Sequence, residues 1–223
     1  MDDPKLLEVL EVFAARICHD LVGAVGAVSN GVELLSEGGE AADPEVLALI
    51  SSSARTASRR LQYFRTAFGT GSALSATRPL DGARSLAASF LEEGKVALDW
   101  AEPPAAAEAA AGRRAAKAVL NLVIVAADCL PRGGRVAIES APVEAGLSIR
   151  VRASGAQARL ADDHRAALAA SVRAAGAAAG GAPTPRGVPS WIVRALVDGA
   201  KGNVDVTEGQ DMVVLGLRVP RQY

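Results

Sequence analysis

Apolar residues near the N-terminus recur at the spacing of one helical face. Each step between them is three or four residues, which predicts an amphipathic helix of about eight turns at ~3.6 residues per turn. We expect Gly38 and Gly39 to end this helix. The apolar positions are Leu6, Leu10, Phe13, Ile17, Leu21, Ala24, Val28, Val32 and Leu35.

A second helical face follows after a short connection. Asp43 before Pro44 is typical of an N-cap followed by proline at the first helical position. The apolar residues of this face are Leu47, Ile50, Ala54, Ala57, Leu61, Phe64 and Phe68, and Gly69, Gly71 and Ser72 should close the helix. A connection this short places the two helices antiparallel. Because two helices alone cannot bury both faces, we expect two copies to pair as a homodimer with a four-helix bundle.

From residue 79 the pattern changes to short helical and strand segments, and an α+β fold with helices on one face of a sheet is expected. The predicted helices cover residues 79–93, 107–130, 160–175 and 189–198. The predicted strands cover residues 96–100, 135–140, 147–153, 203–207 and 212–219. We expect 135–140 to pair with 147–153 around a turn and 203–207 to form a hairpin with 212–219, and residues 176–185 are expected to form a loop. The chain therefore divides into a helical hairpin, residues 1–72, and a second domain, residues 73–223.

Composition narrows the function classes. The 223 residues carry a formal net charge of -1, which lacks the positive charge that nucleic-acid binding usually requires. Cys18 and Cys129 are too few for a disulfide framework or a cysteine-rich metal site. The acidic N-terminus is unlike a secretory signal, and the longest apolar run, Val119–Ala127, is interrupted by Asn121 and shorter than the ~20 residues of a membrane span. We expect a cytoplasmic protein that binds neither membrane nor nucleic acid.

His19 lies on the opposite side of the first helix from its apolar face. At ~100° per residue it points about 170° away from the centre of that face, toward solvent. Its helical neighbours Ala15, Gly23 and Gly26 are small, although each glycine costs about 1 kcal/mol relative to alanine within a helix. Such a surface is expected where another molecule approaches closely.

An exposed neutral imidazole has a free nitrogen lone pair that can attack phosphorus. The carboxylate of Asp20 is expected to orient the other ring nitrogen of His19. The alternative is that His19 is an ordinary surface histidine. The second histidine, His164, follows Asp162 and Asp163 and is expected to be solvated on a charged helix, and no ligand spacing supports a two-histidine metal site.

Charged residues on the two helices have two open interpretations. The arginines of the second helix would lie near the level of His19 and either contact a phosphorylated or acidic partner or form a solvated face. They are Arg55, Arg59, Arg60 and Arg65. The acidic residues of the first helix serve either partner docking or solubility, and they are Glu8, Glu11, Glu33 and Glu37.

The stretch from Arg16 to Leu35 resembles the phosphoacceptor box of sensor histidine kinases, above all that of the ChpT-type histidine phosphotransferases of alphaproteobacteria. The resemblance rests on His-Asp-Leu-Val-Gly at 19–23 and Ser-Asn-Gly-Val-Glu-Leu-Leu at 29–35. It implies a dimerising helical hairpin followed by a degenerate copy of the kinase ATP-binding domain. Ala24 replaces the usual proline, so the helix should run on without a kink, and Gly23 replaces the residue that positions water for phosphatase action.

The nucleotide-binding boxes of the kinases are altered in the second domain. Asn121 is kept, but Val125 stands where the second asparagine belongs. The stretch Val151–Gly155 lacks the aspartate that recognises adenine, and Pro189 and Ser190 interrupt the last glycine-rich box. We therefore expect no cofactor and neither binding nor hydrolysis of ATP.

The resemblance implies a histidine phosphotransferase with His19 as phosphoacceptor. It would accept a phosphoryl group from the receiver domain of a hybrid histidine kinase and pass it to response regulator receiver domains of the CtrA type, with Mg²⁺ supplied by the receiver. The expected docking residues are Val12, Arg16, Val22, Gly23, Gly26, Arg59 and Arg60. An ATP-dependent histidine kinase with divergent boxes and a non-catalytic receiver-docking module are the alternatives.

Overall fold

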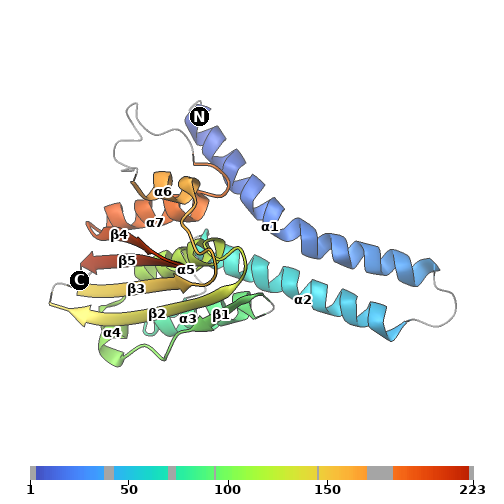
Figure 1. The fold of residues 1–223 in the computed structure, drawn as a ribbon, viewed down its shortest axis with the longest axis horizontal. Coiled ribbons are helices and arrows are strands. Elements are labelled where there is room, and N and C mark those ends of the chain that lie inside the picture. The colour runs from blue at the N-terminus through green and yellow to red at the C-terminus, as the bar shows by residue number, and fades with distance from the viewer. Residues whose placement is uncertain are drawn as a thin grey trace.

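The chain forms a long helical hairpin joined to a sandwich of one sheet and several helices, as the computed structural model shows (Figure 1). This is the expected α+β class. The structure describes residues 4–37, 43–69, 74–92, 94–144, 146–169 and 183–220.

The hairpin consists of α1 (Pro4–Glu37) and α2 (Pro44–Ala67). The Asp43 carboxylate accepts a hydrogen bond from the backbone N–H of Glu45 at 2.8 Å, so the predicted N-cap is confirmed. Of the expected helix-ending residues, Gly69 follows directly on the C-cap Phe68. Gly38, Gly39, Gly71 and Ser72 lie outside the described residues, as does the predicted domain boundary at residues 72 and 73.

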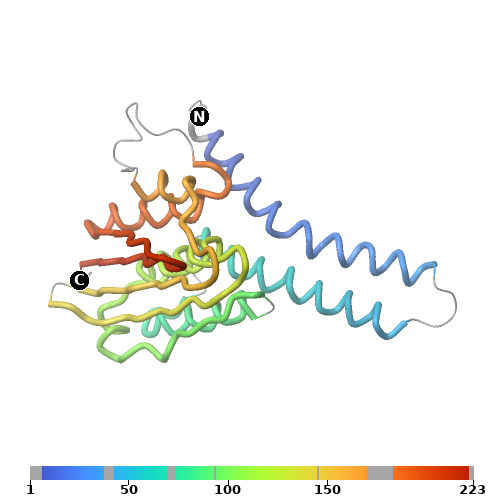
Figure 2. The backbone as a smooth tube through the Cα atoms, in the orientation of Figure 1, coloured from blue at the N-terminus to red at the C-terminus, as the bar shows by residue number. Residues whose placement is uncertain are grey.

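The C-terminal half of α1 and the N-terminal half of α2 lie side by side, and the two helices separate toward the sandwich (Figure 2). Their close approach depends on Gly31, which is buried against α2. A Cβ atom at this position would lie 2.5 Å from Cγ1 of Ile50, closer than two carbon atoms can pack. The glycine therefore allows the two backbones to approach.

The apolar surface of α1 is only partly covered by α2. Leu10 and Val32 on α1 and Leu47 and Leu61 on α2 belong to the predicted apolar faces and are 44–56% exposed. By length and composition alone, the stretch Leu7–Glu37 is also apolar enough to cross a membrane. It nevertheless packs along α2 and carries a buried arginine, which are features of a helix packed against protein.

One five-stranded sheet forms the second domain, in the order β1-β2-β3-β5-β4. Strands β1 and β2 are parallel and the remaining pairs are antiparallel, with Val151 of β3 opposite both Ile138 and Leu215. The predicted hairpin pairings of the strands are thus confirmed. The strands are β1 (Val96–Asp99), β2 (Gly134–Val143), β3 (Gly146–Ser154), β4 (Asn203–Gly209) and β5 (Met212–Pro220).

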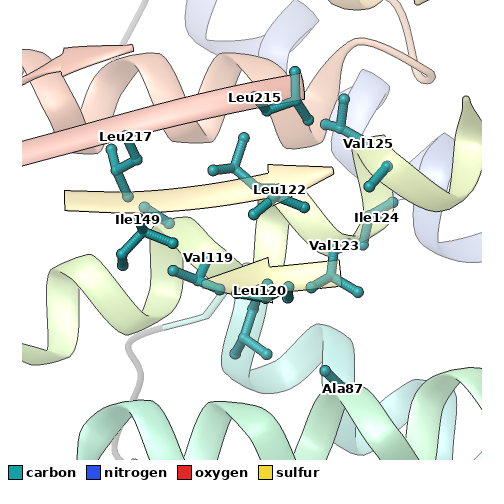
Figure 3. Packing of buried hydrophobic residues seen from close by; sticks show 14 of the residues in the cluster. Ala87, Val119, Leu120, Leu122, Val123, Ile124, Val125, Ile149, Leu215 and Leu217 are labelled. Atoms are coloured by element: carbon teal, nitrogen blue, oxygen red, sulfur yellow. The ribbon is translucent and has the colours of Figure 1, made fainter. Parts of the chain in front are cut away.

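Helix α5 is the centre of the core, packed between the sheet and the other helices (Figure 3). Its residues Val119, Leu120, Leu122, Val123 and Val125 have no exposed surface. Burial of apolar side chains of this size contributes about 1.5–3 kcal/mol each. The helices of this domain are α3 (Pro79–Leu91), α4 (Ala105–Ala110), α5 (Arg113–Asp128), α6 (Asp162–Ala169) and α7 (Val188–Gly199).

The single helix predicted over 107–130 is wrong, because the chain breaks between α4 and α5. Ala111 and Gly112 are extended, with ψ of 131° and 168°. The break lets the buried carboxylate of Glu108 accept hydrogen bonds from the backbone N–H groups of Leu80 and Asp81, in the first turn of α3.

The helix predicted over 160–175 is described only in part. Helix α6 begins at Asp162, two residues later than predicted. Residues 170–182, which include most of the predicted loop, lie outside the described residues.

Hydrogen bonds fasten the end of α2 to α5. The hydroxyl of Tyr63 donates to the carbonyl of Leu120 at 2.7 Å. The Asn121 amide donates to the carbonyl of Ala67 at 2.8 Å, and the Lys117 ammonium donates to that of Gly69 at 2.6 Å. The donors Asn121 and Lys117 satisfy carbonyls that the end of α2 leaves unpaired, and a cation there also suits the helix dipole.

An aromatic contact fastens α1 to the second domain. The ring of Phe13 lies 6.1 Å from that of Phe68 and 6.0 Å from that of Trp191 on α7, both edge to face. Both helices of the hairpin are thus fixed to the second domain. The turn of α1 that follows Phe13 is therefore held beside the second domain.

Replacing Gly31 with alanine should destabilise the hairpin. The added methyl group must displace Ile50, which costs more than the ~1 kcal/mol gained in helix propensity, and we expect a net loss of about 1–2 kcal/mol. The control is Gly26→Ala, because no atom lies within 4 Å of a Cβ there, and it should stabilise by about 0.5–1 kcal/mol. Urea unfolding measures both, and equal effects of the two substitutions would contradict the close approach.

Candidate functional site

His19 projects from the middle of α1 with its side chain 83% exposed, so its outward orientation is confirmed. Its Nδ1 lies 3.0 Å from Oδ1 of Asp20. Because a carboxylate only accepts hydrogen bonds, Nδ1 carries the hydrogen of a neutral ring. The Nε2 atom then holds the lone pair, and it has no hydrogen-bond partner in the described part of the chain.

The carboxylate of Asp20 is itself held in place. Its second oxygen, Oδ2, accepts a hydrogen bond from Nε of Arg16 at 2.6 Å, one helical turn earlier. The backbone carbonyl of Asp20 accepts a hydrogen bond from the guanidinium of Arg60 on α2, which is at the level predicted from the antiparallel pairing. One carboxylate oxygen is thus left to His19 while the rest of the residue is anchored.

Arg16, one of the predicted docking residues, lies beside His19 but is largely buried. Its side chain is only 10% exposed and bridges two carboxylates, with NH1 3.0 Å from Oδ2 of Asp128 at the end of α5. The face of α1 that carries Arg16 is covered because it packs against the second domain. Burial lowers the pKa of Arg16, but the negative charges of Asp128 and Asp20 outweigh it and raise the pKa above its ordinary value.

His164 is also placed differently from the prediction. It is fully buried, not solvated, with Nε2 3.2 Å from Oδ2 of Asp128 and Nδ1 2.9 Å from Oγ of Ser190 on α7. The prediction was wrong because the charged neighbours of His164 describe only the outer face of α6. The inner face of that short helix packs against α7.

Asp128 connects the second domain to this site. Burial raises the pKa of its carboxyl group, but the hydrogen bond from His164 and the positive charge of Arg16 outweigh it and lower the pKa below the ordinary value of 3.8. Asp128 is therefore ionised at neutral pH. A continuous series of contacts results, running through His19, Asp20, Arg16, Asp128, His164 and Ser190.

A groove of about 540 Å³ opens beside the imidazole, between α1 and the second domain. From the second domain, Arg186 reaches the same groove, and its guanidinium donates to the backbone carbonyl of Asp128 at 3.2 Å. Sequence reasoning did not identify Asp128 or Arg186 as site residues. A carboxylate directly after the apolar run Leu122–Ala127 was the available signal for Asp128. The lining residues are Ala15, Arg16, His19, Asp20, Asp128, Pro185 and Arg186.

The other expected docking residues fall into two groups. On α1, Val22 is 66% exposed, and no atom lies within 4 Å of a Cβ built on Gly23 or Gly26, whereas Val12 is half-buried. On α2, Arg59 and Arg60 are half-buried. Arg59 forms an ion pair with Glu92 at 2.9 Å, and Arg60 contacts the backbone of Asp20.

Residues at the positions of the kinase nucleotide boxes take part in packing. Asn121 is fully buried, and its amide nitrogen donates to backbone carbonyls. Val125 has no exposed surface, and the buried Ser190 is bonded to His164. Among the described residues, no group of three or more histidine, cysteine, aspartate or glutamate side chains is arranged to hold a metal ion.

Comparisons with known proteins agree with this architecture. Residues 80–212 match the family model of the histidine phosphotransferase C-terminal domain. The chain is 37% identical over 141 residues to the protein phosphotransferase ChpT of Brucella abortus (strain 2308), an alignment that spans 62% of this chain and 65% of that relative. A solved structure described as a bacterial phosphotransferase superimposes with a TM-score of 0.75 and 27% identity, covering 95% of this chain and 96% of the other.

The contribution of Asp128 to stability should depend on pH. Its pKa is lowered in the folded protein, so its stabilisation is complete above the ordinary value of 3.8 and is lost as the pH falls through the folded value. At pH 7 we expect Asp128→Asn to cost about 1–3 kcal/mol in unfolding free energy.

The difference between wild type and Asp128→Asn should shrink toward zero below pH 3.8, measured by urea unfolding at a series of pH values. Asp162→Asn, at a fully exposed carboxylate on α6, is the matched control and should have little effect at any pH. A difference that persists unchanged in acid would contradict the assigned charge pairing.

Proposed function

Because the chain belongs to the histidine phosphotransferase family, we propose that it carries a phosphoryl group on His19 in a multistep phosphorelay. It accepts the group from the receiver aspartate of a hybrid histidine kinase and passes it to the receiver aspartates of response regulators of the CtrA type. One observation carries the proposal: Asp20 holds Nδ1 of the imidazole, while Nε2 is free beside an open groove.

The reaction follows from the protonation of the ring. Nε2 of His19 attacks the phosphorus of the receiver acyl phosphate, an N–P bond forms, and the bond from phosphorus to the receiver carboxylate breaks. Nδ1 keeps its hydrogen, so the ring becomes positively charged. The carboxylate of Asp20 at 3.0 Å stabilises that charge as it develops. Reversal of the same steps returns the phosphoryl group to a second receiver.

The surroundings of His19 suit a visiting receiver. The glycines at 23 and 26 leave open space on the outer face of α1, and Val22 adds exposed apolar surface. Arg186 brings a positive charge to the groove from the second domain, where it can face phosphoryl oxygens. Mg²⁺ and the carboxylate that carries the phosphoryl group belong to the receiver, so this chain needs no cofactor of its own.

We further propose that two copies pair through the hairpins as a homodimer in the cytoplasm. The half-exposed residues of the two apolar faces support this, because a partner hairpin would cover them in a four-helix bundle. Large apolar side chains left exposed along both helices of one molecule are typical of an interface.

Two other functions make different predictions. An ATP-dependent kinase would label itself when incubated alone with ATP, but the commitment of Asn121 and Ser190 to internal hydrogen bonds favours transfer without ATP. A docking module that carries no phosphate would bind receivers equally well without His19 and would give no labelled intermediate.

Substituting His19→Gln should abolish labelling by a phosphorylated receiver, with a loss of at least about 100-fold, because the glutamine amide is not a nucleophile. The label is measured on the purified protein after transfer from a ³²P-phosphorylated receiver. Cys18→Ala, at the exposed neighbouring position, is the control and should be labelled normally. A His19→Gln protein that is still labelled would reject the assignment of the phosphoacceptor.

Introducing charge into the exposed apolar face should separate the dimer. We expect the double variant Val32→Glu and Leu47→Glu to sediment as a monomer at concentrations where the wild-type protein sediments as a dimer, because the two carboxylates would have to be buried. Asn30→Glu places a charge on the exposed outer side of α1 and should leave the dimer intact. A wild-type protein that sediments as a monomer would contradict the proposed assembly.

A further inference from the structure

The second domain reaches the phosphoacceptor through the series of contacts that ends at His19. Resting on the proposed function, we propose that Asp128 and His164 are positioning residues that hold the imidazole of His19 in its reactive tautomer. The reactive form has hydrogen on Nδ1 and the lone pair on Nε2. The second domain thus acts on the chemistry of a residue that, among the described residues, it does not bind by a hydrogen bond.

The first link is the arginine between two carboxylates. Arg16 uses two different nitrogens, Nε toward Asp20 at 2.6 Å and NH1 toward Asp128 at 3.0 Å. The planar guanidinium therefore has its orientation fixed at both ends. The side chain of Arg16 is only 10% exposed, so solvent screens its two ion pairs little.

The second link fixes Asp128. Because the Asp128 carboxylate is ionised and only accepts hydrogen bonds, Nε2 of His164 is the donor at 3.2 Å. In the neutral ring, Nδ1 of His164 then accepts from the hydroxyl of Ser190 at 2.9 Å. His164 and Ser190 are both fully buried, between α6 and α7, so this anchor belongs to the interior of the second domain.

The third step is electronic. While Asp128 shares the positive charge of Arg16, Asp20 keeps enough negative charge on Oδ1 to be a strong acceptor for the Nδ1 hydrogen of His19. If Asp128 is displaced or neutralised, Arg16 pairs with Asp20 alone and weakens that acceptor. The ring then shifts toward the tautomer with hydrogen on Nε2. In that tautomer Nε2 has no lone pair with which to attack phosphorus.

His164 offers the sharpest test, because a side chain with no exposed surface cannot contact a receiver. His164→Leu removes both hydrogen bonds, whereas the amide nitrogen of His164→Gln can still donate to Asp128. The chain has two histidines, and these variants lack His164, so their ¹⁵N-histidine NMR spectra report His19 alone. Transfer kinetics from a phosphorylated receiver provide the second readout.

We expect His164→Leu to increase the fraction of His19 with hydrogen on Nε2 and to lower kcat by about 10-fold, with KM changed less than about twofold. His164→Gln should restore most of the wild-type tautomer fraction and most of kcat. An unchanged tautomer with unchanged kcat in His164→Leu would overturn the proposal, as would a rise in KM with kcat unaffected.

Asp128→Asn decides the question if His164→Leu does not fold. It should move the His19 tautomer in the same direction, and the matched control Asp162→Asn should leave it unchanged. An Asp128→Asn protein with the wild-type tautomer would overturn the proposal. Since the tautomer is measured without phosphate, a shift in a protein that no receiver labels would refute the proposed function and leave the positioning role standing.

Discussion

The structure of the site depends on one buried cation held between two carboxylates. Arg16 belongs to α1 and binds Asp20 on the same helix, but its other contact, Asp128, is at the end of α5 in the second domain. Removing either carboxylate would leave the guanidinium partly unpaired away from water, which is costly. The interaction therefore ties the conformation of the turn of α1 that carries His19 to the packing of the two domains.

The rest of the interface makes this alignment possible. Asn121 and Lys117 of α5 bind the carbonyls at the end of α2, and Trp191 of α7 packs against Phe13 of α1. Asn121 stands where the kinase resemblance places a nucleotide-binding asparagine, yet its amide is committed to the hairpin. We interpret the second domain as a support that seats the hairpin and contributes one wall of the groove beside His19.

Local patterns in the sequence predicted the elements that depend on local interactions. The helical periodicity gave α1 and α2, and the same periodicity turned His19 outward beside Asp20. The solvated position predicted for His164 was wrong, and the burial of Arg16 was not predicted, because both are buried by segments distant in the sequence, which periodicity does not report. The break between α4 and α5 was missed for a related reason, since it serves a tertiary contact of Glu108.

We propose above all that His19 reacts through Nε2 because Asp20 holds Nδ1. The most direct measurement is ³¹P–¹⁵N NMR of ¹⁵N-histidine-labelled protein after phosphorylation by a receiver. We expect a single phosphorus–nitrogen coupling, to Nε2 of His19, with Nδ1 still protonated. A phosphoryl group on Nδ1 of His19, or on His164, would contradict it.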